Sequence, residues 1–481
     1  MTHIQEDPSA LDYQHTRVEH WNMVAMNFKH WGQRGGYYRQ RLQEVFATVV
    51  PRGQRVLEIG CSRGDLLAAM QPAYGVGIDF SADMIKLARE AHPELTFIEA
   101  DAHTLALDET FDFIILSDLL NDLWDVQLVL EQVAQWCTPH TRIILNAYSR
   151  LWELPLLLAA KLGLAKPRLY QNWLTVEDMA HLLNLAGFES IRSWSEVLMP
   201  VRFPLIDVLC NRYLVKLGLF RWMAVTNFMV ARPQAPQTLP EKEPIVSVIV
   251  PARNEEGNIE AIFARTPEMG AGTELVFVEG NSTDNTYQKI KETIALHPER
   301  NCQLFQQTGK GKGDAVRLGY QHASGDVLMI LDADLTVPPE DLPRFYQALV
   351  KGQAEFVNGV RLVYPMEKEA MRFANLLGNK FFSLAFSWLL GQPVKDSLCG
   401  TKVLWKDAYL RIAANRHVFG DFDPFGDFDL LFGAARLNLK IVDLPIRYRE
   451  RTYGSTNIQR WKHGVLLLRM VLFAANKIKF I

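Results

Sequence analysis

Acidic residues follow three apolar runs in the second half of the chain, where buried strands are expected to end. The runs and their acids are Ile245–Val250 with Glu255, Glu274–Val278 with Glu279, and Val327–Leu331 with Asp332 and Asp334. Two aspartates at i and i+2 after a strand place two hard oxygen ligands where a divalent cation and a diphosphate can share them. Such ligation suits Mg²⁺ or Mn²⁺. The pattern predicts a metal and phosphate site at one edge of a sheet.

A glycine-rich turn stands out in the first half. The apolar run Arg55–Ile59 leads into Gly60 and Gly64, and a helical pattern follows. A strand that turns into a helix through glycines brings bare backbone N–H groups close to a ligand. About 20 residues later a second run ends at Asp79, whose carboxylate can accept both hydroxyls of a ribose. The spacing predicts a pocket for a nucleoside.

Further polar residues follow the next apolar runs of the first half. Asp101 and Ala102 follow Leu95–Glu99, Asp118 follows Phe111–Leu116, and Asn146 follows Arg142–Leu145. Helical stretches alternate with these runs, which predicts a doubly wound parallel sheet with its ligands outside the carboxyl ends of the strands.

The elements that position these residues fall into two domains. The chain has 481 residues, 48% of them hydrophobic, which is enough for two to three packed domains. Ala231–Pro244 contains four prolines in fourteen residues, and repeated proline favours an extended, solvated path. We expect domains at residues 1–230 and 245–481, joined by a linker at 231–244.

Composition narrows the kinds of partner. The net charge of −3 gives no general attraction to nucleic acid, so no nucleic-acid partner is expected. No apolar leader follows Met1 and the five cysteines lack CxxC spacing, so we expect a cytoplasmic protein.

The apolar runs Phe381–Leu390 and Val465–Ala475 fall short of the ~20 residues of a membrane span. Val465–Ile481 fits a helix on a membrane surface or one packed against the sheet, and both interpretations stay open.

The pattern Glu58-x-Gly60-x-x-x-Gly64 resembles motif I of the class I S-adenosylmethionine-dependent methyltransferases, and the resemblance covers about Val50–Asn146. It implies S-adenosylmethionine as cofactor, with Glu58, Gly60 and Gly64 shaping the pocket for its methionine end. It also implies that Asp79 binds the ribose and that Asp101 and Ala102 flank the adenine.

Methyl transfer needs the acceptor held in line with the methyl group, and proximity alone can supply roughly 7–11 kcal/mol. Asp118 and Tyr148 are candidates to deprotonate or orient an acceptor hydroxyl. Asn121 and Asp122 share this position but could equally cap helices. The aromatic residues of the lead-in Leu11–Val50 and of the insertion around Trp173 could cover the core or, in the insertion, build the acceptor pocket.

The motif Pro251-x-x-Asn254-Glu255, the run Ser282–Thr286 and Asp332-x-Asp334 together resemble the family 2 glycosyltransferases of GT-A fold, from Ile245 to about Gly464. The similarity is strongest to polyprenyl-phosphate sugar synthases such as dolichyl-phosphate mannose synthase. It implies a nucleotide-diphosphate sugar donor with Pro251, Asn254, Glu255 and Glu279 around the nucleoside, and Asp332 and Asp334 on the metal. Family members usually have DDGS where this chain has Glu279–Ser282, which leaves the nucleotide base open.

The same resemblance assigns residues beyond the strand ends. Lys312 lies in a glycine-flexed basic loop that could contact phosphates or be a solvated charge run. Asp427 matches the position of the family's general base, with Asp429 as the alternative; on a helix the two would face different ways.

Arg460 and Trp461 resemble the end of the family's QxxRW motif and would hold the leaving diphosphate or an acceptor phosphate. Residues 396–402, with Gly400, match the acceptor-side loop, and Arg372, Asn375 and Asn379 lie on a helical pattern leading to it.

These observations predict an α/β protein with a Rossmann-like methyltransferase sheet and a GT-A nucleotide-sugar-binding sandwich. We expect a bifunctional enzyme acting on a glycan or polyprenyl-phosphate acceptor, with inversion at the sugar. Two alternatives remain: the first half is only a ligand- or partner-binding module, or the second half is a sugar transferase without a lipid. The oligomeric state, sugar, nucleotide and methylated atom stay open.

Overall fold

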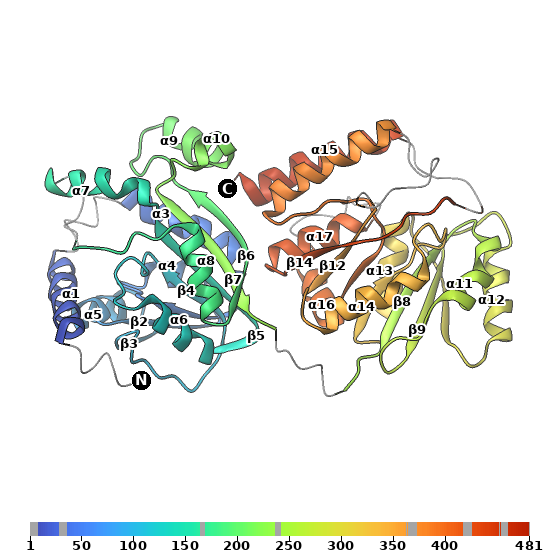
Figure 1. The fold of residues 1–481 in the computed structure, drawn as a ribbon, viewed down its shortest axis with the longest axis horizontal. Coiled ribbons are helices and arrows are strands. Elements are labelled where there is room, and N and C mark those ends of the chain that lie inside the picture. The colour runs from blue at the N-terminus through green and yellow to red at the C-terminus, as the bar shows by residue number, and fades with distance from the viewer. Residues whose placement is uncertain are drawn as a thin grey trace. The chain divides into compact units, whose positions relative to one another are not determined.

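The chain folds into two units, Met1–Gln234 with Lys479–Ile481 and Ala235–Ile478 (Figure 1). The computed structural model describes residues 8–27, 36–163, 169–235, 242–361, 363, 373–416, 426–451, 453 and 460–480, with the backbone alone at 373–377 and 460–463. Each unit is a sheet covered by helices on both faces.

The N-terminal sheet has the strand order β3-β2-β1-β4-β5-β7-β6. Its strands are β1 (Arg55–Ile59), β2 (Tyr74–Asp79), β3 (Thr96–Glu99), β4 (Phe111–Ser117), β5 (Cys137–Tyr148), β6 (Phe188–Glu196) and β7 (Thr226–Pro233). The expected strands β1 to β5 are confirmed and pair in parallel. Beyond these strands, β7 is antiparallel to both β5 and β6, a direction that was not predicted.

The helices of this unit are α1 (Pro8–Met26), α3 (Gly36–Val49), α4 (Asp65–Ala69), α5 (Ala82–Ala91), α6 (Val126–Gln135), α7 (Glu153–Lys161), α8 (Val176–Leu185), α9 (Ile206–Val208) and α10 (Gly218–Arg221). Two apolar clusters lie on the two faces of the sheet: Leu57 and Ile59 belong to one and Val56 to the other, as the two-residue period of a strand requires. Thr175 and Asp178 form a capping box at the start of α8.

The strand β7 extends beyond Val230, where the linker was expected to begin. Ala231 is buried and pairs with Ile143 and Ser190, so the first three residues of the expected linker belong to the sheet. Pro233 ends the strand, since proline has no N–H to donate to a ladder. Residues 236–241 of the expected linker lie outside the described residues.

The C-terminal sheet has the order β10-β9-β8-β11-β13-β12-β14. Its strands are β8 (Val246–Ala252), β9 (Thr273–Glu279), β10 (Asn301–Gln306), β11 (Val327–Ile330), β12 (Phe356–Val360), β13 (Lys402–Trp405) and β14 (Ile441–Pro445). β10, β9, β8 and β11 are parallel, and β13 is antiparallel to β11 and β12. The carboxyl ends of β8, β9 and β11 therefore meet at one edge, which gathers the predicted acids.

The helices of this unit are α11 (Ile259–Arg265), α12 (Thr286–Leu296), α13 (Lys312–His322), α14 (Leu342–Val350), α15 (Phe373–Leu390), α16 (Lys406–Ala414), α17 (Asp427–Arg436) and α18 (Arg460–Ala474). α18 packs beside α15. In α18 Leu467 and Met470 are buried, whereas Leu468 and Leu472 are exposed, so one face of the helix packs within the protein and the other is exposed. Among the described helices, none combines the length and hydropathy needed to cross a bilayer.

Candidate functional sites

A cavity opens at the carboxyl ends of the parallel strands of the N-terminal unit. It encloses about 570 Å³ with its open mouth and is lined by Gly60, Asp79, Asp101 and Ala102, together with apolar side chains such as Ile59. This volume lies in the range of small-molecule sites. Four residues predicted to bind one cofactor therefore share one pocket.

Asp79, at the end of β2, is held by two backbone donors. Its carboxylate accepts hydrogen bonds from the N–H groups of Ser62 and Ser81, each at 2.9 Å. Burial raises the pKa of Asp79 to about 6, although these two hydrogen bonds favour its ionised form. The carboxylate is thus fixed at the pocket wall with lone pairs left to accept hydroxyl groups.

The glycine turn shapes the pocket in two different ways. Gly60 and Gly64 both have φ near +76°, a conformation that favours glycine. A Cβ on Gly60 would lie 2.9 Å from Leu119 Cδ1, and one on Gly64 would lie 2.5 Å from the Phe97 ring. Gly60 lines the cavity, whereas Gly64 lets the turn pack against β3 and is absent from the cavity lining.

Glu58 is a buried acid beside this turn, outside the cavity lining. Burial raises the pKa of Glu58 well above its usual range, although a hydrogen bond from the Leu67 backbone opposes the shift. Its Oε2 atom has no hydrogen-bond partner among the described residues. A buried acceptor left in this way is suited to a donor supplied by a ligand.

One wall of the cavity comes from α1, which sequence reasoning treated only as a cover for the core. Tyr13, Gln14 and Arg17 line the cavity. The amide of Gln14 donates to Asp101, and Arg17 Nε donates to the carbonyl of Asp122 at 3.0 Å. No local pattern signals these contacts, because each joins residues far apart in the chain.

Asp118 and Tyr148 meet beside the cavity, with a residue that sequence reasoning missed. Asp118 has φ +52°, and its Oδ1 accepts hydrogen bonds from Asn146 Nδ2 at 2.6 Å and Tyr38 Oη at 3.1 Å. The ring of Tyr38 stacks on that of Tyr148 at 5.8 Å. Burial, with the Asp118 charge adding to it, raises the pKa of Tyr38 well above its usual range, so Tyr38 is a hydroxyl donor at neutral pH.

Asn121 and Asp122 hold the backbone together. The side chain of Asn121 donates to the carbonyl of Asn172 at 2.6 Å and accepts from the N–H of Tyr148 at 3.1 Å. Asp122 accepts from Gln171 Nε2 at 3.0 Å. Trp173 packs at the edge of the core, which fits the core-packing interpretation of the insertion.

The second site lies where α13 and α17 begin. Lys312 Nζ lies 2.6 Å from Asp332 Oδ1. Burial would lower the pKa of Lys312, but the carboxylates of Asp332 and Asp427 outweigh it and raise the pKa. A Cβ on Gly400 would lie 2.0 Å from Asp332 Oδ2, and one on Gly426 would lie 2.6 Å from the Gly313 backbone. Two glycines thus allow the backbone to close around three charged side chains.

Asp334, the second acid of the pair, faces another cation. Arg451 donates to Asp334 Oδ2 at 2.7 Å and to Glu255 Oε1 at 2.9 Å. Asp334 also accepts from the hydroxyl of Thr336 at 2.7 Å. Burial raises the pKa of Glu255 to about 7, although Arg451 opposes the shift. No local pattern in the sequence places Arg451 between these two acids.

The loops after β8 and β9 are joined by side-chain hydrogen bonds. Asn254 (φ +56°) accepts from the N–H of Thr283 at 2.8 Å. Glu279 is buried and accepts from the N–H of Ser282 at 2.6 Å. Pro251 lies at the end of β8, paired in register with Val278. The predicted nucleoside residues are therefore neighbours, and Glu279 supports the loop from inside.

The two acids of α17 face different ways, as predicted. Asp429 lies 3.3 Å from Arg416 and 3.6 Å from Arg317, while Asp427 lies on the side of Lys312. In the predicted acceptor loop, Asp396 is buried and bound by Arg361 through hydrogen bonds of 2.7 and 2.9 Å. Arg317 thus lies beside Asp429, whereas Lys312 lies beside Asp332.

The acids present fit a divalent cation that also takes phosphate oxygens. Among the residues that the structure describes, no three His, Cys, Asp or Glu gather as a complete protein cage. Mg²⁺ is commonly held by one or two carboxylates, with water and substrate phosphates completing its shell. Asp332 and Asp334 supply two carboxylates, which match that arrangement. Each of them also lies beside a cationic side chain, Lys312 or Arg451.

Some predicted residues cannot be placed. The side chains of Arg460, Trp461 and Asn375 belong to helices described by their backbone alone, and Arg372 and Asn457 lie outside the described residues.

Comparison with known proteins identifies both units. A family model described as methyltransferase domain matches residues 30–193, and one described as glycosyl transferase family 2 matches residues 247–408. A dolichol-phosphate mannosyltransferase of Pyrococcus furiosus is 38% identical over 220 residues, which are 44% of this chain and 59% of that protein. The chain thus spans little more than half the length of this relative.

Two solved structures resemble one unit each. An S-adenosylmethionine-dependent methyltransferase from Mesorhizobium loti is 20% identical with a TM-score of 0.32, over 39% of this chain and 95% of that one. Glucosyl-3-phosphoglycerate synthase from Mycobacterium tuberculosis, solved with Mn²⁺ and UDP, is 20% identical with a TM-score of 0.36, over 49% and 80%. The family models thus place one match in each unit, a methyltransferase domain in the first and a family 2 glycosyl transferase in the second.

Proposed function

We propose that this protein is a bifunctional enzyme. One domain transfers a methyl group from S-adenosylmethionine to a hydroxyl of a glycan or glycolipid. The other transfers a sugar, with inversion, from a nucleotide sugar to a polyprenyl phosphate or a glycan. The observation that carries the second activity is the meeting of Lys312, Asp332 and Asp427 where Gly400 and Gly426 let the backbone close in.

In the sugar-transfer site, Asp332 and Asp334 would hold Mg²⁺ or Mn²⁺, and a bound cation supplies positive charge for a leaving diphosphate. Lys312 adds a fixed charge for the same phosphates. Asp427 takes the proton of an attacking hydroxyl, a role worth roughly 10²–10⁴-fold. With an acceptor that is already a phosphate, that base matters less.

Six more residues complete this donor site in our proposal. Pro251, Asn254 and Glu255 surround the nucleoside, with Glu279 supporting their loop. Arg460 and Trp461 hold the diphosphate, as the family resemblance implies.

In the methyl-transfer site, Asp79 accepts the ribose hydroxyls, and Asp101 and Ala102 flank the adenine. Glu58 lies beside the glycine turn that would face the methionine end, and its buried Oε2 lacks a partner among the described residues. Asp118 and Tyr38 orient the acceptor hydroxyl, because the carboxylate can accept its proton while the Tyr38 hydroxyl holds the carboxylate in place. S-adenosylmethionine, when bound, supplies the electrophilic methyl group.

A lipid-linked acceptor is supported by the name of the Pyrococcus relative and by the exposed leucines of α18. In this proposal the protein binds peripherally, at the cytoplasmic face of a membrane. The shared-substrate idea, in which both domains modify one glycolipid, rests on their covalent linkage.

Three measurements test this proposal. S-adenosylmethionine at 100 times its Kd should stabilise the N-terminal unit by about 2.7 kcal/mol, and labelled methyl groups should appear in glycan or lipid extracts. Asp334→Asn should abolish sugar transfer and leave methyl transfer unchanged. Cofactor binding without methyl transfer to any glycan or lipid extract would favour a binding module, and equal loss of both activities would indicate misfolding.

A further inference from the structure

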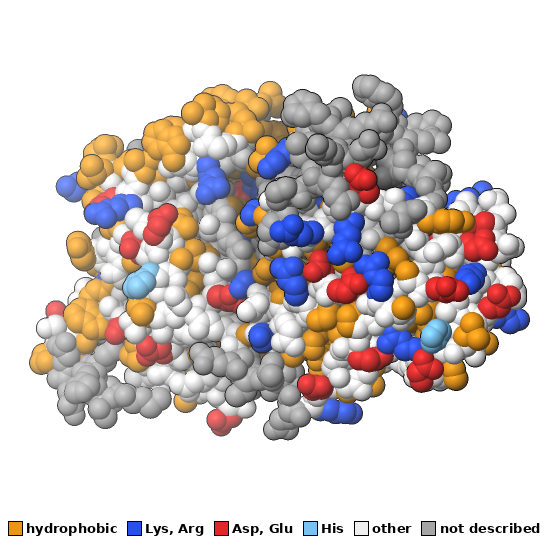
Figure 2. All heavy atoms as spheres, turned by 45° about the vertical axis from the view of Figure 1, so that its right-hand side comes forward, with side chains coloured by type: hydrophobic (Ala, Val, Ile, Leu, Met, Phe, Trp, Pro, Cys, Tyr) orange, Lys and Arg blue, Asp and Glu red, His pale blue; other side chains and the backbone are white. Residues whose placement is uncertain are grey.

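Apolar side chains gather on α7 and on residues 201–223, which contain α9 and α10; we call these together the apolar cap. No residue of α7 or α10 is buried. Exposed fractions reach 76% at Leu154, 84% at Leu205, 75% at Leu219 and 64% at Trp222. Figure 2 shows hydrophobic side chains gathered along the top of the molecule, where Figure 1 places α9 and α10. Patches of this kind usually mark an interaction site.

The two parts of the apolar cap adjoin. Trp152, just before α7, donates from Nε1 to the carbonyl of Met223 at 2.8 Å. The N–H of Ser149 donates to the carbonyl of Val225 at the same distance. The start of α7 is therefore held against the end of the 201–223 segment.

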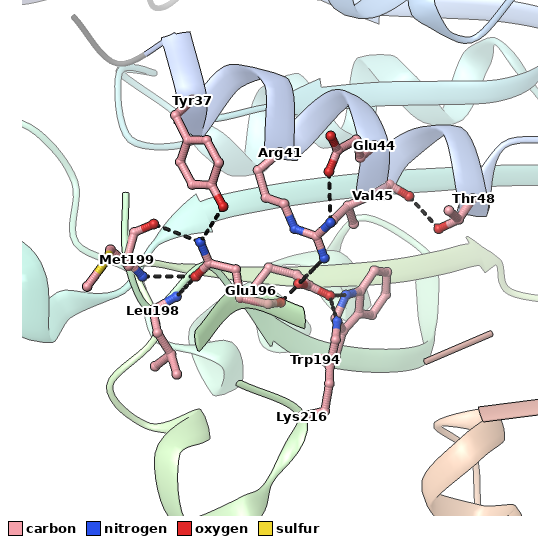
Figure 3. A network of polar contacts seen from close by, with 11 residues as sticks. Tyr37, Arg41, Glu44, Val45, Thr48, Trp194, Glu196, Leu198, Met199 and Lys216 are labelled. Atoms are coloured by element: carbon pink, nitrogen blue, oxygen red, sulfur yellow. Dashed lines mark hydrogen bonds and ion pairs between the residues drawn. The ribbon is translucent and has the colours of Figure 1, made fainter. Parts of the chain in front are cut away.

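A buried polar network fixes the apolar cap from beneath (Figure 3). Asn211 accepts from the N–H groups of Leu198 and Met199 at 2.8 and 2.9 Å and donates to Tyr37 Oη at 3.1 Å. Lys216 pairs with buried Glu196. The polar side chains at these positions turn inward while the apolar ones turn outward, so the exposed surface is an ordered one.

Charge on the 201–223 segment points to the partner. Three arginines each precede an exposed aromatic residue: Arg202-Phe203, Arg212-Tyr213 and Arg221-Trp222. The acid of this segment, Asp207, is 4% exposed, and Lys216 is buried in its pair with Glu196. The exposed formal charge of the segment is therefore wholly positive.

We propose that the apolar cap docks on an anionic lipid bilayer, with its leucines and aromatic rings in the interface and its arginines on the headgroups. Aromatic rings favour the membrane interface, and basic residues beside an apolar face add attraction to anionic lipid. A symmetric contact between two copies would bring the unbalanced arginines together. The inference goes beyond the proposed chemistry, since it holds for either substrate.

Flotation of the full chain with vesicles tests this, using phosphatidylcholine alone and with phosphatidylglycerol added. The unaltered protein should float with the anionic vesicles. Leu219→Glu with Trp222→Glu should weaken binding by about tenfold or more. Arg202→Gln, Arg212→Gln and Arg221→Gln together should weaken it by about a hundredfold at low salt, as about 1 kcal/mol per arginine implies. The control Leu185→Glu changes a residue of the same unit, 53% exposed on α8, and should bind normally.

Several outcomes would overturn the proposal. If the unaltered protein does not bind anionic vesicles, bilayer docking is excluded. Full binding by the Leu219/Trp222 variant, with loss in Leu468→Glu, would assign membrane contact to α18 instead. A change of native mass in the Leu219/Trp222 variant, without a change in vesicle binding, would identify the apolar cap as a contact between copies. All variants lie at exposed positions, and unchanged thermal midpoints would confirm that they fold.

Discussion

Gly400→Ala is expected to disable sugar transfer while leaving the fold in place. The added methyl carbon would lie 2.0 Å from Asp332 Oδ2 and 2.2 Å from Lys312 Nζ. Non-bonded atoms prefer about 3.5 Å, so the carboxylate and the ammonium must retreat by more than about 1 Å. Displacement of this size in a reacting site costs about 10²-fold in rate. We therefore expect about a hundredfold loss of sugar transfer.

The stability cost of Gly400→Ala should be smaller. Lys312 and Asp332 are 26% and 25% exposed, and ion pairs of such exposure contribute about 0.2–1 kcal/mol. Adding a methyl group to a packed region costs about 1–3 kcal/mol, so the domain should stay folded. Separate assays of sugar transfer, methyl transfer, Mn²⁺ affinity and thermal unfolding distinguish these effects.

Gly378→Ala is the matched control for this substitution. Gly378 lies within α15 and a Cβ there meets nothing within 4 Å, so both transfers should be unchanged. Alanine favours a helix over glycine by about 1 kcal/mol, so stability should rise slightly. If Gly400→Ala transferred sugar at the normal rate, the Lys312–Asp332 pair would not belong to the reacting site and the reasoning would fail.

Three further results are expected. Affinity for S-adenosylmethionine, measured by calorimetry, should fall as the pH drops through about 6, where Asp79 takes up a proton and loses acceptor capacity; Asp79→Asn should bind weakly with little dependence on pH in that range. Asp427→Asn should lose sugar transfer to hydroxyl acceptors, with an unchanged thermal midpoint. Asp429→Asn should instead keep its activity and lose about 1–3 kcal/mol of stability. If the two variants showed the opposite pattern, the roles of Asp427 and Asp429 would be exchanged. Gly64→Ala should destabilise the N-terminal unit in thermal unfolding, because its methyl group would overlap the Phe97 ring, and normal stability would contradict that packing.

The sequence predicts best those elements and residues that follow from a local pattern of residue types. Buried strands appear as apolar runs, and ligands collect at their carboxyl ends, so Asp79, Glu279 and Asp332 could be found without coordinates. Helical geometry likewise separates Asp427 from Asp429, since residues two positions apart on a helix point about 200° apart around its axis.

Contacts between distant residues could not be predicted in this way. Tyr38 reaches Asp118 across 80 residues, and Gln14 reaches Asp101 across 87. Each contact depends on where a helix packs against the rest of the domain, and the spacing of apolar residues within that helix does not specify this. The antiparallel direction of β7 was hidden for a similar reason, because an apolar run has no inherent direction. Gly400 was matched to the acceptor-side loop, but a Cβ added to it would meet Asp332 and Lys312.

The bridge made by Arg451 also bears on when the donor site can form during synthesis. Its guanidinium contacts Glu255, which lies 196 residues earlier in the chain. Closing a flexible loop of that length costs about 4–5 kcal/mol of chain entropy, so the bridge forms only after the sheet between its ends has brought them together. At about 5–20 residues per second, a ribosome needs about 10–40 s to travel from Glu255 to Arg451. During that interval Glu255 and Asp334 lack the cation that pairs them in the finished domain.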